Sequence, residues 1–332
     1  MNKEMSQKKI LVVKNDHIGD MILTTGVFRE LKKAFSDSRL VVVSSKVNKV
    51  MVEENPYVDR IIVADHGKKF VKNWRNYFKV RKEIAKEKFD VSIDLRGDFL
   101  NIFFLMFLSN AGRRIGFYKS FWSKMFLNFG KKKNPSEHII QNMFDLICEG
   151  LGINVKNISP EIFVNERDKK ELKDFIEKNK LRKFICICPD ASHPKRLLPL
   201  KTFDEVIKKI KGKYPSYKIL IPGVSERVDW LAEKNKETIP IKFANLKMLY
   251  LLFQKAGVVL SLDTGTTPLS WAGDSNLINI LLKFSLPWKE YLKPLSKNAV
   301  VVWEKDKPIE SGEIIKEIDK FLGVRSNGDG FI

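Results

Sequence analysis

Two widely separated stretches decide the fold of this chain, Ile10-Leu-Val-Val-Lys-Asn-Asp-His-Ile-Gly-Asp20 and Val258-Val-Leu-Ser-Leu-Asp-Thr-Gly-Thr-Thr267. Each begins as an apolar run typical of a buried strand, turns abruptly to Gly and Asp, and continues into a helical pattern. Open α/β sheets bind their ligands at such strand-to-helix junctions. Two junctions of this kind predict two sheets whose ligand-binding edges face one cleft.

Strand-like and helical runs alternate around these stretches. Short runs rich in Val and Ile lie at residues 10–14, 40–44, 60–63 and 91–95, with amphipathic stretches such as 25–35 and 71–88 between them. The alternation restarts after Pro160, with helical runs at 166–178, 202–211, 226–236 and 246–255 and strand-like runs at 184–188, 217–221 and 258–262. This order predicts two α/β domains, each built on a parallel sheet.

The length and composition fit two globular domains. The 332 residues are 44% hydrophobic, which is enough for a core in each domain. We expect an N-terminal domain over residues 1–162 and a C-terminal domain over 163–308. A C-terminal helix at 309–324 could pack on either domain, including back on the N-terminal one, and 325–332 has the composition of a frayed tail.

The charge and the cysteines narrow the class of protein. Sixty Lys and Arg residues against 40 Asp and Glu give a formal charge of +20, which favours anionic partners, with ordinary solubility as the alternative. Cys148, Cys186 and Cys188 form no paired framework and are interpreted as reduced core residues. No secretory signal opens the chain, so we expect a cytoplasmic protein.

Two segments could interact with a membrane. The apolar run at 99–108 has about half the roughly 20 residues that a membrane-spanning helix needs. Residues 117–133 interleave aromatic side chains with lysines, as surfaces at lipid headgroups do. We expect the lysines Lys131, Lys132 and Lys133 to be exposed and to dock an anionic membrane or glycolipid. The alternative is a buried helix pair with snorkelling lysines, which we favour for 99–108.

Five short motifs occur in a suggestive order. They are the segment Lys14 to Gly26, Asp94-Leu-Arg-Gly-Asp98, Arg114-Ile-Gly-Phe117, Lys195-Arg-Leu-Leu-Pro199 and Asp263-Thr-Gly265. Together they resemble the signatures of glycosyltransferase family nine, the bacterial lipopolysaccharide heptosyltransferases. The resemblance implies a GT-B fold of two Rossmann-like domains, the N-terminal one binding the acceptor and the C-terminal one the nucleotide-sugar. It also implies inversion of the transferred sugar's anomeric centre.

The resemblance assigns the acceptor side to the first junction. Asp20 would be the general base that takes the proton of the acceptor hydroxyl, and its alternative role is to cap the helix that follows. We expect acceptor contacts from Lys14, His17, Gly19, Arg96 and Arg114. A lone surface histidine is the alternative for His17.

The donor side lies in the second half of the chain. Lys195 and Arg196 follow a strand and would neutralise the diphosphate, unless they belong to a solvated basic loop. By resemblance, Asp263 would position the sugar, and Thr264, Gly265 and Thr266 would hold the phosphates, with a plain capping loop as the alternative. The resemblance implies two further donor contacts, Glu226 at the ribose and Met248 near the base. The alternative for Glu226 is an acid in the first turn of a helix.

Departures from the family pattern leave the donor open. Pro268 stands where the family usually has His, and Asp190 where it often has Gly. The expected function is transfer of a sugar, heptose from ADP by family precedent, to a lipopolysaccharide core or related glycolipid. The alternatives are a transferase of the same fold that uses another sugar donor, and a protein that binds glycolipid or nucleotide with impaired catalysis.

Other classes of function find less support. The four histidines have no ligand spacing and no Asp-x-Asp follows a strand, so we expect no metal and no cofactor. The sequence lacks the glycine-rich motifs of dinucleotide oxidoreductases and P-loop kinases. Nucleic-acid binding could use the basic-aromatic surface but would leave Asp20 and Asp263 unexplained. We expect a monomer, peripherally associated with the cytoplasmic face of the inner membrane.

Overall fold

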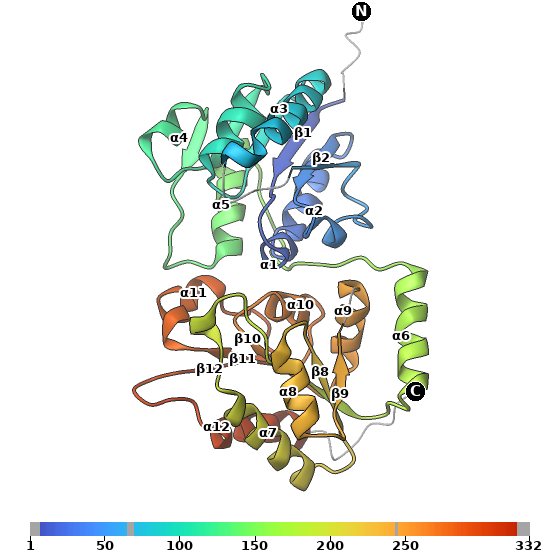
Figure 1. Ribbon diagram of the computed structural model, residues 1–332. Coiled ribbons are helices and arrows are strands. Elements are labelled where there is room, and N and C mark those ends of the chain that lie inside the picture. Colours follow the sequence, from blue (N-terminus) through green and yellow to red (C-terminus); the bar gives the residue numbers. More distant parts are fainter. Residues whose placement is uncertain (1–6, 65–69, 243–244, 324–332) are drawn as a thin grey trace, which may run out of the picture. The chain divides into compact units, whose positions relative to one another are not determined.

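The chain forms two compact units, Met1–Phe163 and Val164–Ile332, each built on a six-stranded parallel sheet (Figure 1). The computed structural model describes residues 7–64, 70–242 and 245–323, with side chains for all of these except 70–74. The expected tail at 325–332 lies outside the described residues. Two parallel sheets covered by helices confirm the predicted α/β class.

The sheet of the N-terminal unit has the strand order β3-β2-β1-β4-β5-β6. Its strands are β1 (Lys9–Val13), β2 (Arg39–Ser44), β3 (Arg60–Val63), β4 (Val91–Asp94), β5 (Arg113–Phe117) and β6 (Phe129–Lys131). Its helices are α1 (Ile18–Ile22), α2 (Thr25–Ala34), η1 (Lys49–Met51), α3 (Phe70–Glu87), the π-helical η2 (Asn101–Phe107), α4 (Phe121–Met125) and α5 (Ile139–Leu151). The direction of strand order reverses between β1 and β4, which makes their carboxyl ends the switch point where such sheets bind ligands.

The sheet of the C-terminal unit has the order β12-β11-β10-β7-β8-β9, so its switch point lies between β10 and β7. Its strands are β7 (Phe184–Cys188), β8 (Lys218–Pro222), β9 (Ile239–Ile241), β10 (Val258–Leu262), β11 (Leu277–Leu281) and β12 (Ala299–Trp303). Its helices are α6 (Glu166–Lys178), η3 (Pro194–Arg196), α7 (Leu200–Lys213), α8 (Glu226–Lys234), α9 (Leu246–Lys255), α10 (Thr266–Ala272), η4 (Lys283–Trp288), α11 (Lys289–Leu292) and α12 (Ser311–Gly323).

The central strands read as continuous apolar runs because both faces of each sheet are covered. Every residue of β7 and β10 is buried, as expected for parallel strands with helices on both sides. The second unit opens with α6, whose N-terminus carries a capping box in which the side chains of Asn165 and Asp168 each accept the other's backbone N–H. The cap therefore fixes the start of α6 at Glu166.

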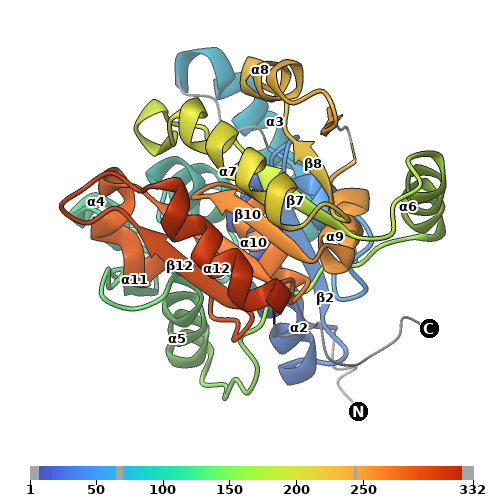
Figure 2. The same ribbon diagram turned by 90° about the horizontal axis from the view of Figure 1, so that it is seen from below.

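The C-terminal helix packs within its own unit. α12 lies along α7 and the strands β10 to β12, and Figure 2 shows it beside α7 and β12. Its apolar side Ile314, Ile318 and Leu322 belongs to the core of the second unit. Asp319 on the same helix accepts hydrogen bonds of 2.6 Å from Lys213 and 2.6 Å from the hydroxyl of Tyr214. In the part of the chain described, no helix is both long and apolar enough to cross a membrane.

Candidate active site

The N-terminal unit gathers charged side chains where β1 and β4 end. Lys14, the first residue after β1, is 1% exposed. Its Nζ donates a 2.8 Å hydrogen bond to Asp16 and lies 3.9 Å from Oδ1 of Asp20. Burial on its own would lower the pKa of Lys14, but the two carboxylates raise it above its ordinary value. Lys14 therefore stays charged beside Asp20.

Asp20, the expected base, lies in the first turn of α1. The exposed His17 occupies the N-cap position of this helix, so the alternative reading of Asp20 as the N-cap residue is wrong. The side chain of Asp20 is 36% exposed. Desolvation raises the pKa of Asp20, and Lys14 opposes the rise. A carboxylate that remains accessible and has a cation beside its charged form is suited to accept a proton.

Asp94, the last residue of β4, completes this edge. It is fully buried, and its carboxylate accepts the backbone N–H groups of Arg96, Gly97 and Asp98 at 3.0, 3.0 and 3.1 Å. Burial raises the pKa of Asp94 to about 6 although the bonds from Arg96 and Asp98 favour its charged form. Gly97 has a φ of +77°, and a Cβ there would lie 3.1 Å from the Cβ of Phe117, so the loop requires glycine.

Lys133 also belongs to this cluster. The sequence analysis did not identify it as a site residue. It follows β6, and its ammonium lies 5.1 Å from the centroid of the Phe117 ring. Burial lowers the pKa of Lys133 to about 8; Lys14 adds to this effect, whereas Asp94 and Asp20 oppose it. Two lysines and several carboxylates therefore share one edge, a placement that strand order produces and sequence spacing does not reveal.

The expectation that Lys131, Lys132 and Lys133 are all surface charges is wrong for two of them. Lys131 is paired with Glu149 and lies 3.8 Å from Asp145, both on α5. Lys133 is only partly exposed, and its burial lowers its pKa. Lys132 alone of the three is exposed.

The other expected acceptor residues divide into two groups. His17 and Gly19 belong to the start of α1, and Arg96 belongs to the loop that holds Asp94. Nη1 of Arg96 is buried and has no hydrogen-bond partner within the described residues, so it is available to an anion. Arg114 is not brought to this edge: it lies near the amino end of β5, where its guanidinium donates to the carbonyls of Phe126, Ala111 and Gly112.

A second cluster lies at the switch point of the C-terminal unit. Asp263, the residue after β10, is 9% exposed. Its Oδ2 accepts a 2.6 Å hydrogen bond from the hydroxyl of Ser285 and lies 3.4 Å from Nη1 of Arg196. The fold thus joins two expected donor residues, Arg196 and Asp263, and adds Ser285, which the sequence analysis missed. The apolar run at 277–281 just before Ser285 was the available signal, because a strand there would end at the same edge.

The loop after Asp263 leads into α10. Thr264, Gly265 and Thr266 are partly exposed there, and Gly265 is the N-cap residue. The hydroxyl of Thr266 lies 2.6 Å from that of Ser261. Pro268 occupies the third position of the helix, where a backbone N–H would have no intrahelical partner, so it costs the helix no hydrogen bond.

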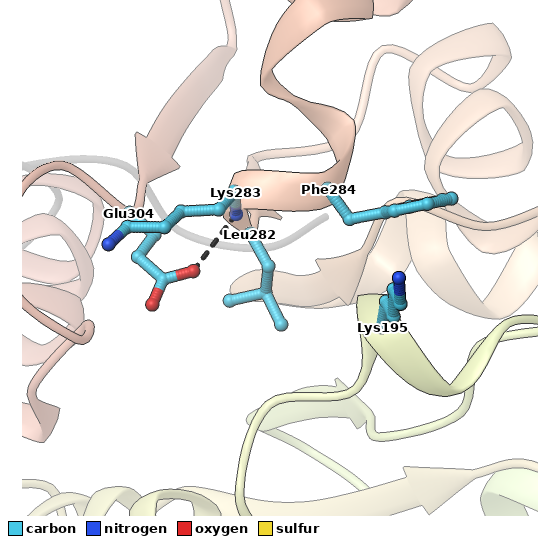
Figure 3. A pocket seen from close by; sticks show the side chains of 5 residues that line it. All are labelled: Lys195, Leu282, Lys283, Phe284 and Glu304. Carbon is cyan, nitrogen blue, oxygen red and sulfur yellow. Dashed lines mark hydrogen bonds between the residues drawn. The ribbon is translucent and has the colours of Figure 1, made fainter.

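A pocket of about 500 Å³ opens beside η3 and η4. Figure 3 shows the five residues that line it, Lys195, Leu282, Lys283, Phe284 and Glu304. The Lys195 ammonium and the guanidinium carbon of Arg196 each lie 5.7 Å from the centroid of the Phe284 ring. On the other side, Glu304 accepts the backbone N–H of Lys283 at 2.9 Å. The pocket therefore offers an exposed cation, an aromatic ring and a carboxylate.

The ring of Phe284 is itself held in place. The imidazole of His193 stacks on it, with a centroid distance of 4.4 Å and an interplanar angle of 7°. Nδ1 of His193 also accepts the backbone N–H of Lys195 at 3.2 Å, so the same side chain fixes the start of η3. Among the pocket residues, the sequence analysis identified Lys195 and missed the other four, which are Leu282 at the N-cap of η4, Lys283 and Phe284 on η4, and Glu304 after β12.

The two other residues expected to contact the donor, Glu226 and Met248, lie elsewhere in the C-terminal unit. Glu226 is exposed at the first position of α8, whereas Met248 on α9 is 5% exposed and packs inside. Asp190 accepts the backbone N–H groups of Val224 and Ser225 at 2.8 and 3.1 Å, so it ties the loop after β7 to the start of α8. The acid that departs from the family pattern thus has a structural role. Among the residues described, no group of three or more His, Cys, Asp or Glu is arranged to hold a metal ion.

Comparisons with known proteins agree with this architecture. Residues 77–318 match the model of glycosyltransferase family 9 (heptosyltransferase). A comparison with curated protein sequences gives no match. The crystal structure of the glycosyl transferase family 9 from Veillonella parvula DSM 2008 is similar to this chain with a TM-score of 0.83 and 20% identity, covering 97% of this chain and 99% of that one.

Two Escherichia coli enzymes have similar structures. Heptosyltransferase WaaC with ADP covers 94% of this chain, and ADP-heptose lps heptosyltransferase II covers 95%. Each matches over 99% of its own length, with a TM-score of 0.77 and 16% identity. These likenesses show the fold, which is the predicted GT-B fold with two Rossmann-like units. Because the family model spans well over half of the sequence, this chain belongs to glycosyltransferase family 9, the heptosyltransferase family.

Proposed function

We propose that this protein is an inverting glycosyltransferase that moves a sugar from a nucleoside diphosphate to a hydroxyl of an anionic glycolipid. The observation that carries the proposal is the accessible carboxylate of Asp20, 3.9 Å from the buried ammonium of Lys14, at the switch point of the N-terminal sheet. A base must be reachable by the acceptor and ionised at neutral pH. Desolvation raises the pKa of Asp20 and works against its ionisation, whereas Lys14 favours the ionised form.

The reaction then needs one displacement. The Asp20 carboxylate accepts the proton of the acceptor hydroxyl while its oxygen forms a bond to the anomeric carbon of the sugar. The bond from that carbon to the diphosphate oxygen breaks on the opposite face, and the bonding electrons leave with the diphosphate. Attack and departure on opposite faces invert the anomeric centre.

The departing diphosphate needs positive charge. In the C-terminal unit, Lys195 is exposed at the pocket, and Arg196 on η3 is held by Asp263. Charge-assisted bonds from these two cations, together with the backbone at Thr264 to Thr266, would stabilise the leaving group. We propose that this supply of charge makes a divalent metal unnecessary, so that turnover should survive chelation by EDTA.

Heptose carried on ADP is the donor that we propose first. The structurally similar Escherichia coli proteins are heptosyltransferase WaaC with ADP and an ADP-heptose lps heptosyltransferase II. On the acceptor side, Lys133 and the buried Nη1 of Arg96, which has no partner among the described residues, lie at the edge that carries Asp20 and favour an acceptor with negative groups. A lipopolysaccharide core or related glycolipid has that chemistry.

The test is transfer by the purified protein, followed by mass spectrometry of the acceptor. With ADP-heptose and a soluble lipopolysaccharide-core fragment, the acceptor should gain one heptose. Asp20→Ala should bind ADP normally by calorimetry and turn over about a hundredfold more slowly or worse, the scale of a lost general base. Near-normal turnover by the folded variant would mean that Asp20 is not the general base. If the parent protein bound ADP but transferred sugar to none of the acceptors tried, the alternative of a binding protein with impaired catalysis would be favoured.

A further inference from the structure

The connection between β5 and β6 exposes an unusual group of apolar side chains. On the five-residue helix α4, Phe121, Trp122 and Met125 are 70%, 65% and 57% exposed. Exposed apolar residues that are scattered singly are ordinary, but three on one turn and a half of helix form a patch. We call these three residues the α4 patch.

The α4 patch is presented on a rigid base. Ser120 caps the helix by accepting the backbone N–H of Ser123, which is itself buried. Phe126, the residue after the helix, packs on the π-helical η2, with ring centroids 5.0 Å from Phe103 and 4.8 Å from Phe107. The aromatic residues below α4 therefore fix its orientation and leave the α4 patch outward.

The sequence around the α4 patch is rich in positive charge. Between Asp98 and Glu137 the sequence contains seven Lys and Arg residues and no Asp or Glu. Lys119, Lys124 and Lys132 of this set are exposed, and the ammonium groups of Lys124 and Lys132 lie 5.6 and 5.9 Å from the Tyr118 ring centroid. We call these three lysines the α4 lysines.

The α4 patch and the α4 lysines together favour one kind of binding partner. A second copy of this chain would bring the same cations against each other, which costs free energy at a shared face. An anionic bilayer offers acyl chains for Phe121 and Met125, a headgroup region in which tryptophan is favoured, and phosphate for the lysines. The charge pattern therefore matches a membrane surface better than it matches a partner copy.

We propose that α4 is a membrane-docking element that inserts the α4 patch at the headgroup level of an anionic bilayer, with the α4 lysines at the lipid phosphates. This rests on the proposed function only in supplying the reason for docking. The chain runs from α4 through the three residues of β6 to Lys133, which shares an edge with Asp94 and Asp20. A docked α4 would hold that edge close to the lipid that carries the acceptor.

Vesicle sedimentation tests the proposal with the full chain. The parent should bind vesicles of phosphatidylcholine with about 30% phosphatidylglycerol and should not bind pure phosphatidylcholine. Phe121→Ser/Trp122→Ser/Met125→Ser should lose most of this binding, whereas Leu295→Ser, which removes an exposed apolar side chain of the other unit, should not. Replacing the three α4 lysines by Ser should weaken binding by about a hundredfold, since each lysine near an anionic surface contributes about fivefold.

Tryptophan quenching tests which segment enters the bilayer. Phosphatidylcholine brominated on its acyl chains, mixed with phosphatidylglycerol, should quench part of the fluorescence of the parent. Trp122→Phe should still bind but should lose that quenched component. Unchanged quenching in Trp122→Phe, or a triple apolar variant that sediments like the parent, would overturn the proposal. A parent dimer that the triple variant converts to a monomer in gel filtration would also overturn it, in favour of a protein interface.

The design separates docking from catalysis. The α4 variants should transfer sugar to a soluble acceptor fragment at the parent rate, because none of them touches the edge that carries Asp20. Asp20→Ala should bind vesicles like the parent while it loses transfer. If instead Asp20→Ala kept transfer, the proposed mechanism would fail and the docking proposal would stand on the sedimentation result alone.

Discussion

The ammonium of Lys14 lies 3.9 Å from the carboxylate of Asp20, and Lys14 is 1% exposed whereas Asp20 is 36% exposed. The cation is therefore shielded from water and the carboxylate is accessible. This asymmetry suits a base that has to meet a substrate while its charge is stabilised from behind.

Lys14→Met should shift the pH dependence of turnover. Without the cation, desolvation would raise the pKa of Asp20 further, so the acid limb of kcat/KM should move up by about one pH unit or more. The variant should also lose about 3 kcal/mol of stability, because Asp16 would be left without its buried partner. Urea denaturation and a pH–rate profile measure the two effects. Lys170→Met, which removes the cation of an exposed pair with Asp174, should change neither. An unshifted acid limb in Lys14→Met would mean that Lys14 does not stabilise the charged form of Asp20.

Asp94 should make the protein less stable as the pH rises through the acid range. The pKa of Asp94 is about 6 in the folded protein against an ordinary 3.8, so the folded state holds the proton more tightly between these values. Its contribution is zero below about pH 4 and an unfavourable ~3 kcal/mol above about pH 6. The difference in unfolding free energy between the parent and Asp94→Asn should therefore fall by about that amount from pH 4 to pH 7. A constant difference would mean that Asp94 ionises normally.

Lys133→Met should stabilise the protein and impair its use of the acceptor. The pKa of Lys133 falls from an ordinary 10.5 to about 8, so the buried charge is unfavourable below about pH 8 and this cost disappears as the pH rises towards 10.5. Removing it should raise the unfolding free energy at pH 7 by about 1 to 3 kcal/mol. If Lys133 meets a negative acceptor, KM for that acceptor should rise severalfold. Lys132→Met, at an exposed position, is the matched control for both measurements.

Lys195→Ala should weaken binding of the nucleoside diphosphate by about 1.5 to 3 kcal/mol, the scale of a charge-assisted hydrogen bond. Lys195 is exposed at the pocket of about 500 Å³, so its removal should leave the melting temperature unchanged. Isothermal calorimetry with ADP measures the loss. Lys201→Ala, an exposed lysine on the neighbouring α7, should bind ADP like the parent. Equal affinity in both variants would mean that the diphosphate does not bind at this pocket.

Local patterning was sufficient for most of the elements. The predicted runs at 10–14 and 258–262 agree with β1 and β10 to within one residue, because a fully covered strand must be apolar throughout and a polar junction must follow it. Other strands were not predicted: β11 and β12 are apolar runs that were overlooked, whereas β5 and β6 carry mixed signals. β5 begins with Arg113 and Arg114, and β6 has only three residues, so neither presents an apolar run of its own.

The sequence by itself determined two parallel-sheet units, their junction loops and the residue types that end at them, Asp20, Lys195, Arg196 and Asp263 among them. Only the tertiary structure decided which of these share an edge. Because β4 lies beside β1, the buried Asp94 closes the edge of Lys14 and Asp20; because β11 lies beside β10, Ser285 reaches Asp263. Strand order in a parallel sheet is set by how the helices pack across its faces, and spacing along the chain carries little information about it.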